Sequence, residues 1–325
     1  MKRGPVVLIL LAMTILLAGM SLAAGRVWTP LEVWLDPTDL RRLIVLELRL
    51  PRTLLAVAIG AALGMAGAAM QGYTRNPLAD PGALGVSSMA ALGAVLTLYF
   101  GAGAAQPWVI ASAAMAGALA AVLLLLALSG LASSIVTFIL AGVILQTVAG
   151  AGVALALSLA PNPWAVSEIV NWLMGSLADR SMDEVRLALP LMAVGAFLLL
   201  LIGRALDALT LGETGARSLG VDLNRTRWLL AIGVALTAGA SVAVTGVIGF
   251  VGLIVPHILR PIVGARPGGL LIPSALGGAV LVLAADIAVR LAPAPAGEVK
   301  LGVAMAMLGG PFFFALLLSL RRRIA

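Results

Sequence analysis

The sequence contains no cysteine and only one histidine, His257. Without cysteine the chain forms no disulfides and no thiolate metal sites, and it has no cysteine nucleophile. A single histidine does not make a histidine-based metal cluster. We therefore expect no catalytic residue, no metal site and no cofactor bound by this chain.

Charged residues are also scarce, at 11% of the 325 residues, against about 25% in soluble domains. Hydrophobic residues make up 62% of the chain, and no soluble fold of this length could bury so much apolar surface. We therefore expect an all-α integral membrane protein, because helices satisfy their own backbone hydrogen bonds in lipid. Basic cytoplasmic loops explain the net charge of +7 better than a nucleic acid partner, and none is expected.

Ten segments are apolar and close to the roughly 20 residues that a spanning helix needs. The eighth is short and contains Pro256, so a bent or partial crossing is an alternative. The first could be a signal peptide, but its apolar run exceeds the roughly 7–15 residues of a signal core, which favours a retained helix. The whole chain, 1–325, is expected to be one transmembrane domain. The spans are 5–25, 51–72, 82–101, 107–129, 134–158, 184–203, 227–247, 250–263, 270–290 and 301–320.

Ten spans place both termini on the same side of the membrane. If that side is the cytoplasm, its segments hold twelve basic and four acidic residues, whereas the segments on the other side hold nine and ten. An excess of arginine and lysine marks the cytoplasmic side of a membrane protein. The sequence therefore predicts that both termini are cytoplasmic.

The sequence contains an internal echo. "RTLLAVAIGAAL", residues 52–63, and "RTRWLLAIGVAL", residues 225–236, are identical at seven of twelve positions. The first copy begins outside and the second inside, so the pair predicts an inverted repeat, which is typical of transporters. Chance similarity among helices rich in alanine, glycine and leucine is the alternative.

Small residues recur every four positions in the second and last spans, and such ridges let helix backbones approach closely in lipid. We expect them to pack helices together rather than to contact a substrate. Several methionines are interpreted as gap fillers rather than as the lining of a path for a bulky cargo. The ridges are Gly60, Gly64, Ala68 and Gly72, and Gly302, Ala306 and Gly310; the methionines are Met65, Met70, Met305 and Met307.

A polar segment, "RNPLADPGALGVSS" at 75–88, separates the second and third spans. Asn76-Pro77 is expected to end the second span, because proline lacks a backbone donor and disfavours helix at the residue before it. Asp80 suits the N-cap of the next helix, with Pro81 at its first position. The corner is either a plain cytoplasmic turn or the wall of a water-filled mouth.

A second polar segment, about 205–226, lies between the sixth and seventh spans. Thr210 and Glu213 fit a capping box, and Gly220 is expected to end the short helix that follows. Asp222 is expected to cap the seventh span.

That short helix has an apolar edge at Leu219. An amphipathic helix at the cytoplasmic surface meets either the membrane interface or a partner protein. Only two basic residues lie near the helix, which favours the partner protein.

Five stretches, spread in order over nearly the whole chain, resemble the permeases of the ABC importers for iron–siderophore, haem and vitamin B12. The first, "RLPRTLLAVAIGAALGMAGAAMQGYTRNPLADPGALGVSS", covers both the echo and the polar corner. The stretches are residues 49–88, "WLMGSL" at 172–177, "GETGARSLGV" at 212–221, "GFVGLIVPHILR" at 249–260 and "LGGPFFFALL" at 308–317.

The resemblance implies a ten-helix subunit with an inverted-repeat, vitamin B12-permease-like fold in the bacterial inner membrane. Such permeases work as homodimers or paired homologues, with two cytoplasmic ATPase subunits beneath and a periplasmic substrate-binding protein above. This chain has no Gly-x-x-x-x-Gly-Lys-Ser/Thr sequence, so ATP and Mg²⁺ are expected on the partner subunits and the chain itself is not an enzyme. The expected cargo is an iron chelate, siderophore or haem, with vitamin B12 as the alternative.

The same resemblance suggests roles for individual residues. The corner residues resemble part of the cytoplasmic gate, two serines at the start of the fifth span resemble its partner loop, and the short helix resembles the coupling helix in the ATPase groove. The gate residues are Asn76, Pro77, Leu78, Ser133 and Ser134, and the coupling residues are Gly215, Ala216, Arg217, Leu219 and Gly220.

Arg49 and Arg52 share one helix face at the outer mouth, and Arg290 ends the ninth span on the same side. In similar permeases, arginines at these positions meet acidic groups of the binding protein. The alternatives are contacts with lipid headgroups and, for Arg290, an internal pair with Asp286 four residues earlier. Lys300 stands where the family often has proline, which puts a detailed docking arrangement at this corner in doubt.

Two other classes of protein fit the sequence less well. An ion-coupled secondary transporter needs acidic or histidine sites near the bilayer midplane, whereas Asp286 lies close to an outer span end. An integral membrane enzyme needs a cluster of titratable groups, and the spans carry none.

Overall fold

The structure is a computed structural model that describes residues 3–25, 33, 39–100, 107–130, 134–292 and 298–324. Across these ranges the chain forms helices and turns and no strand. Seven helices are long and apolar enough to cross a membrane, and three shorter helices are also apolar. The expected all-α architecture is therefore confirmed, and the ten predicted segments correspond to these seven long and three shorter apolar helices.

The helices follow the predicted spans closely. Spans one to six are α1 (Arg3–Ala23), α4 (Leu50–Thr74), α5 (Val86–Tyr99), α6 (Pro107–Ser129), α7 (Ile135–Ser158) and α9 (Met182–Leu201). Span seven combines α12 (Leu223–Val234), the π-helical η4 (Ala235–Gly239) and α13 (Ala240–Thr245), and the last three spans are α14 (Val251–Val263), α15 (Pro267–Leu291) and α16 (Leu301–Ile324). Shorter helices are α3 (Arg41–Leu43), the π-helical η1 (Ile44–Arg49), the 3₁₀ turn η2 (Pro81–Leu84), α8 (Pro163–Leu173), α10 (Gly203–Leu209) and α11 (Gly212–Ser218).

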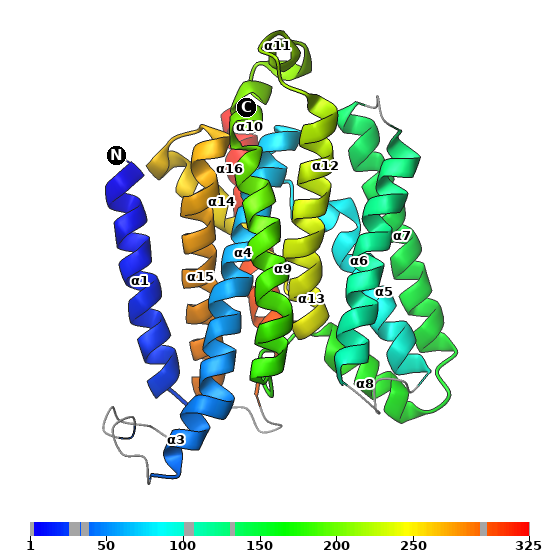
Figure 1. The fold of residues 1–325 in the computed structure, drawn as a ribbon, viewed down its shortest axis with the longest axis vertical. Helices are drawn as coiled ribbons and strands as arrows, with labels where there is room; N and C mark the ends of the chain where they lie inside the picture. Colours follow the sequence, from blue (N-terminus) through cyan, green and yellow to red (C-terminus); the bar gives the residue numbers. More distant parts are fainter. Residues whose placement is uncertain are drawn as a thin grey trace.

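The helices lie side by side in one bundle, with both chain ends at the same end of it (Figure 1). The short helices α10 and α11 lie at that end, and α3 and α8 lie at the opposite end. We call these the α11 end and the α3 end. The termini thus lie at one end of the bundle, as an even number of spans requires, and their cytoplasmic side stays a prediction.

The glycine ridge of the second span packs α4 against α15. A methyl group added to Gly60 would overlap the backbone of Gly278, and one added to Gly64 would overlap the carbonyl of Ser274. Two helix backbones therefore touch along this line, as expected for small residues in lipid. The packing role of this ridge is confirmed.

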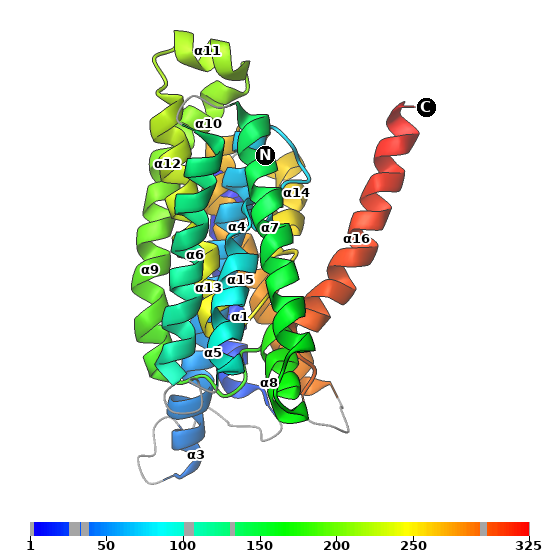
Figure 2. The same ribbon diagram turned by 90° about the vertical axis from the view of Figure 1, so that its right-hand side faces the viewer.

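The ridge expected in the last span behaves differently. Gly302 lies against the carbonyls of Met174 and Val247, but Ala306 and Gly310 are exposed within the described chain. The prediction that this ridge packs a compact bundle is therefore wrong for most of its length. Figure 2 shows the reason, because α16 leans away from the bundle toward its C-terminal end.

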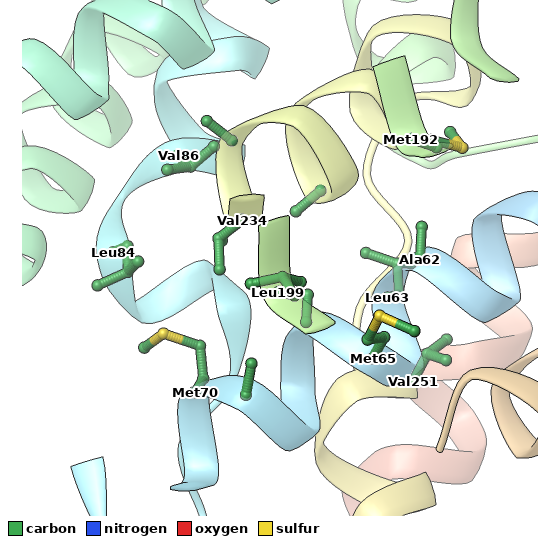
Figure 3. Close-up of a cluster of buried hydrophobic side chains, with 14 of the residues drawn as sticks. Ala62, Leu63, Met65, Met70, Leu84, Val86, Met192, Leu199, Val234 and Val251 are labelled. Carbon is green, nitrogen blue, oxygen red and sulfur yellow. The ribbon is translucent and has the colours of Figure 1, made fainter. Parts of the chain in front are cut away.

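Buried methionines fill the centre of the bundle. Met65 and Met70 of α4 lie in a cluster with Leu199, Val234 and Val251, which come from α9, α12 and α14 (Figure 3). The gap-filling interpretation is confirmed for both, since a flexible thioether fits irregular space between helices. Met305 is buried in the same way, whereas Met307 is 70% exposed.

The eighth predicted span is a short helix with a non-helical lead. α14 has 13 residues, about 20 Å of helix at 1.5 Å per residue, less than the roughly 30 Å of hydrocarbon. The chain before it is non-helical from Gly246, with φ +73°, to Phe250, with φ +68°. Neighbouring backbone groups bond both ends of this segment: the Gly246 amide donates to the Val242 carbonyl at 2.9 Å, and the Ile254 amide donates to the Phe250 carbonyl at 2.9 Å. The partial-helix alternative is the correct one.

Candidate functional site

The α3 end holds a buried network of charges. Arg52 of α4 pairs with Asp286 of α15 at 2.8 Å and also with Glu298, to which its Nη1 donates at 3.0 Å. Arg290 pairs with the same Asp286 at 3.1 Å. The Asp286 carboxylate is fully buried, so two arginines from different helices share one acid away from water.

The same arginines bind the C-terminal end of α1. Arg49 donates to the carbonyls of Leu22 and Ala23 at 3.0 and 2.7 Å. Arg290 donates to the carbonyl of Ser21 at 2.9 Å and to its hydroxyl at 2.6 Å. The last carbonyls of a helix have no partner within the helix and carry partial negative charge. These guanidinium groups therefore supply the hydrogen-bond donors that the last carbonyls of α1 lack.

The internal pair between Arg290 and Asp286 is therefore present. Arg49, Arg52 and Arg290 are each less than a tenth exposed, and they border a cavity of about 280 Å³ at the α3 end. Their docking to a binding protein stays a prediction. Glu298 was not predicted as a partner of Arg52, although its place as an acid just before the last span, on the same side, was the available signal.

The polar corner at the α11 end breaks the helix as expected. Arg75 takes a left-handed conformation with φ +53°, and the Asn76 Oδ1 accepts the Leu78 amide at 2.9 Å. Asp80 caps the next element by accepting the Gly82 amide at 2.8 Å. Loss of hydration raises the pKa of the Asp80 carboxyl above its ordinary value, and this hydrogen bond opposes the rise.

The helix after this corner begins later than expected. Pro81 opens only the short η2, and α5 starts at Val86 rather than at residue 82. Gly85, at φ +74°, lies between the two. Asn76 is exposed, whereas Pro77 and Leu78 are half-buried.

Ser134 caps α7 by accepting the Thr137 amide at 3.2 Å, and Ser133 lies outside the described residues. The Glu213 carboxylate accepts the Ile135 amide at 3.2 Å, which joins α11 to the start of α7. The predicted capping box is therefore wrong, because α11 has no side-chain cap. Glu213 instead accepts an amide of a different helix, α7, and the Thr210 hydroxyl donates to the Asp207 carbonyl at 2.7 Å.

α11 ends as predicted. Gly220, at φ +80°, donates to the Arg217 carbonyl at 2.9 Å, and Val221 donates to the Ala216 carbonyl at 3.1 Å. These two bonds form a Schellman motif, which uses a left-handed glycine to close a helix. Asp222 then caps α12 as expected, by accepting two amides.

Most of the predicted coupling residues are available to a partner. Arg217, Leu219 and Gly220 are exposed, with Leu219 at 64%. Gly215 is half-buried, and Ala216 is fully buried against the chain itself. Ala216 therefore anchors α11, while its neighbours present a cationic and apolar surface at the tip of the molecule (Figures 1 and 2).

Sequence reasoning missed Arg227, which is 3% exposed at the start of α12. It donates to the Tyr73 hydroxyl at 3.1 Å and lies 5.8 Å from the centroid of the Phe138 ring. An arginine facing an aromatic ring gains from a cation–π contact when it is desolvated. This residue links α4, α7 and α12. Its position as the first residue of the predicted seventh span was the available signal.

Gln71 was also missed. Its Nε2 donates to the carbonyl of Gly252 at 3.2 Å, which lacks its usual helical partner because Pro256 has no amide hydrogen. Its Oε1 accepts from Arg260 at 2.7 Å. A lone amide in the apolar second span and a proline in the eighth were the signals, but the sequence does not show that they meet.

Among the described residues, no three or more His, Asp or Glu side chains gather as a metal site would require. The functional features are instead a buried charge network at one end and a helix break with an exposed helix at the other.

Comparison with known proteins identifies the family. Residues 7–319 match the FecCD transport family. The vitamin B12 import system permease protein BtuC of Vibrio cholerae is 42% identical over 298 residues, 91% of this chain and 88% of that protein. The uncharacterized ABC transporter permease protein YvrB of Bacillus subtilis is 41% identical over 285 residues, 86% and 80% of the two chains.

A solved structure gives the same result. It is described as an inward-facing conformation of a metal-chelate type ABC transporter, and it matches with a TM-score of 0.87 at 30% identity. The match covers 97% of this chain and 99% of the other. This chain belongs to the FecCD transport family and is the multi-pass permease subunit of an ABC importer.

Proposed function

We propose that this permease carries a metal chelate across the bacterial inner membrane, with cobalamin or an iron chelate as its cargo. The observation that carries the proposal is the 42% identity, over 91% of the chain, to a permease named for vitamin B12 import. The metal-chelate type transporter at 30% identity supports the wider class, which includes the siderophore or haem complex expected from the sequence.

The α11 end is proposed to face the cytoplasm and to bind two ATPase subunits. Support comes from the basic residues at this end and from the exposed Arg217 and Leu219 at its tip. ATP and Mg²⁺ bind on those subunits in this proposal. Glu213 connects α11 to the start of α7 through a hydrogen bond. In this proposal, a displacement of α11 by the ATPase also moves Ile135, which directly follows the predicted gate residues Ser133 and Ser134.

A second copy of the chain is proposed to pack against α16. Val303, Met307 and Phe314 form an exposed apolar stripe on this helix, and Gly310 lies between them. A helix that leaves its bundle with a small residue on its apolar side suits contact with another helix. The path then lies between two copies, with Asn76, Pro77 and Leu78 at its cytoplasmic gate.

The periplasmic binding protein is proposed to dock at the α3 end. The cavity there is bordered by the predicted arginines and by Asp179 and Glu298. Because the arginines are paired internally, their proposed contribution is to hold this surface in shape and to supply a positive field. Such fields increase the rate and orientation of capture more than the affinity.

Reconstitution in vesicles tests the function. The permease, its ATPase and its binding protein are combined, and uptake of labelled cobalamin, a ferric siderophore and haem is measured with and without ATP. We expect ATP-dependent uptake of one of these chelates, and none when the Walker A lysine of the ATPase is replaced. Uptake driven by an ion gradient without ATP would contradict the proposal in favour of a secondary transporter.

A further inference from the structure

A second cavity, at the α11 end, is basic. It has a volume of about 230 Å³ and lies where the end of α4 meets α10 and the turn between α14 and α15. Its lining includes Gln71, Arg75, Arg260 and Leu270. The transport proposal assigns no role to Arg75, Arg260 or Gln71.

Two guanidinium groups line this cavity, and no acidic side chain is among its lining residues within the described chain. Neither Arg75 nor Arg260 has an ion pair with any carboxylate in that part of the chain. The acids nearest in sequence to the lining residue Thr210 are Asp207 and Glu213, and neither lines the cavity; the first accepts the Gly268 amide at 2.8 Å and the second the Ile135 amide at 3.2 Å. The cavity therefore carries an excess of positive charge that the described protein leaves unneutralised.

Arg260 is held in a fixed position. Its Nη2 donates to Oε1 of Gln71 at 2.7 Å, and Gln71 is in turn held by the carbonyls of Gly252 and Leu253. A guanidinium group has five N–H donors, and Gln71 takes only one of them. The remaining donors of a preoriented arginine suit a planar or tetrahedral oxyanion better than a flexible lysine would.

The surroundings add further positive charge. Arg266 lies between Ala265 and Pro267, which both line the cavity, and the Arg3 guanidinium lies against Gly269 in the first turn of α15. The N-terminal end of a long helix also carries partial positive charge. Arg3 and Arg266 thus lie close in the chain or in space to the residues that line this corner, and Arg75 and Arg260 line it directly.

We propose that this cavity binds a phosphate group, carried by an anionic phospholipid or present as free phosphate. Basic cavities between spanning helices at the cytoplasmic face bind the headgroups of anionic lipids. Leu270 and Ala68 line the cavity beside the arginines, which places apolar surface next to the charge, as a lipid with a phosphate headgroup requires. The lipid is therefore the favoured source.

The test uses the full-length permease in detergent. Native mass spectrometry measures retention of phosphatidylglycerol and of phosphatidylethanolamine offered at equal concentration, and equilibrium dialysis measures binding of inorganic phosphate. The variants are Arg75→Gln and Arg260→Gln, and Arg260→Lys keeps the charge. Arg204→Gln removes an exposed arginine at the same end that does not line the cavity.

We expect the permease to retain phosphatidylglycerol over phosphatidylethanolamine, and each glutamine variant to weaken this retention about fivefold, with Arg204→Gln unchanged. Because Arg75 is exposed, its variant keeps the test valid even if Arg260→Gln fails to fold. Binding of inorganic phosphate alone, with the same dependence on Arg75, would support the free-phosphate source. Retention in Arg75→Gln equal to that of the unchanged protein, for both probes, would overturn the proposal.

Discussion

Asp286 is the acid on which two buried arginines depend. It pairs with Arg52 and Arg290, and its carboxylate is fully buried. Removing one partner from a buried ion pair costs about 3–5 kcal/mol, because a charge is left without compensation. We predict that Asp286→Asn lowers the free energy of unfolding by an amount in this range. Denaturant-induced unfolding of the purified permease in detergent measures it.

The matched control is an exposed pair. Arg186 lies 3.1 Å from Asp183, and their side chains are 75% and 85% exposed. Such pairs contribute roughly 0–1 kcal/mol, since water screens them, so Arg186→Gln is expected to be nearly neutral. Equal effects of Asp286→Asn and Arg186→Gln would contradict the role of the buried network.

The contacts of single residues could be predicted where the partner lies close in the sequence. Asp80 and Asp222 cap the helices that follow them within two or three residues. Arg52 and Glu298, by contrast, are 246 residues apart, and no local pattern shows which of several acids an arginine will meet. Glu213 illustrates the same limit. Its position in the sequence suits a cap of its own helix, α11, but its carboxylate instead accepts the Ile135 amide at the start of α7.

At the scale of helices, the contact between α4 and α15 depends on missing side chains. A methyl group on Gly278 would overlap the carbonyl oxygen of Gly60, and backbone atoms do not move aside cheaply. We predict that Gly278→Ala destabilises the permease by about 1–3 kcal/mol, the usual cost of overpacking. Thermal unfolding in detergent measures the change.

Gly19→Ala is the control, because nothing lies within 4 Å of the position that its methyl group would occupy. It lies inside α1, where alanine is more favourable than glycine by roughly 0.5–1 kcal/mol. Opposite signs are therefore expected for the two substitutions. A stable Gly278→Ala variant would show that the helices do not touch along the glycine ridge.

The helix α11 carries the prediction about coupling. Arg217 is exposed near its end, so reversing its charge leaves the fold intact while changing the surface offered to an ATPase. We predict that Arg217→Glu lowers substrate-stimulated ATP hydrolysis by the assembled transporter without changing the unfolding temperature of the permease. Arg186 is exposed on α9, so Arg186→Glu is the control, and the transporter assembled with this variant should hydrolyse ATP at the unchanged rate. Normal coupled hydrolysis in Arg217→Glu would remove that residue from the interface.

The existence of most helices followed from apolar length alone, which is why the predicted spans match α1, α6 and α7 closely. Helix type was harder to predict. The seventh span contains the π-helical η4, and the chain is non-helical from Gly246, inside the predicted seventh span, to Phe250, the predicted start of the eighth. Both are inside apolar runs, and hydropathy does not distinguish an α-helix from irregular backbone that other helices satisfy.

For the whole molecule, the sequence predicted the number of apolar helices and the shared end of the termini, because both depend only on counting apolar segments. It did not predict that α16 would leave the bundle. Gly302, Ala306 and Gly310 were expected to pack within the chain, yet only Gly302 does so. A small-residue ridge indicates close packing but does not say whether the neighbour belongs to the same copy of the chain.

Whether a second copy of the chain packs on α16 can be tested by cross-linking. The sequence contains no cysteine, so a single introduced thiol reports on one position. Gly310 of α16 and Gly19 of α1 are both exposed, and an added side chain meets nothing within 4 Å at either. If a second copy packs on α16, a bifunctional thiol reagent should join Gly310→Cys into a species of twice the mass on a denaturing gel. Gly19→Cys, on a helix with no proposed partner, should stay monomeric under the same conditions. Equal cross-linking of both variants would mean chance collision, and α16 would then face lipid rather than a second permease.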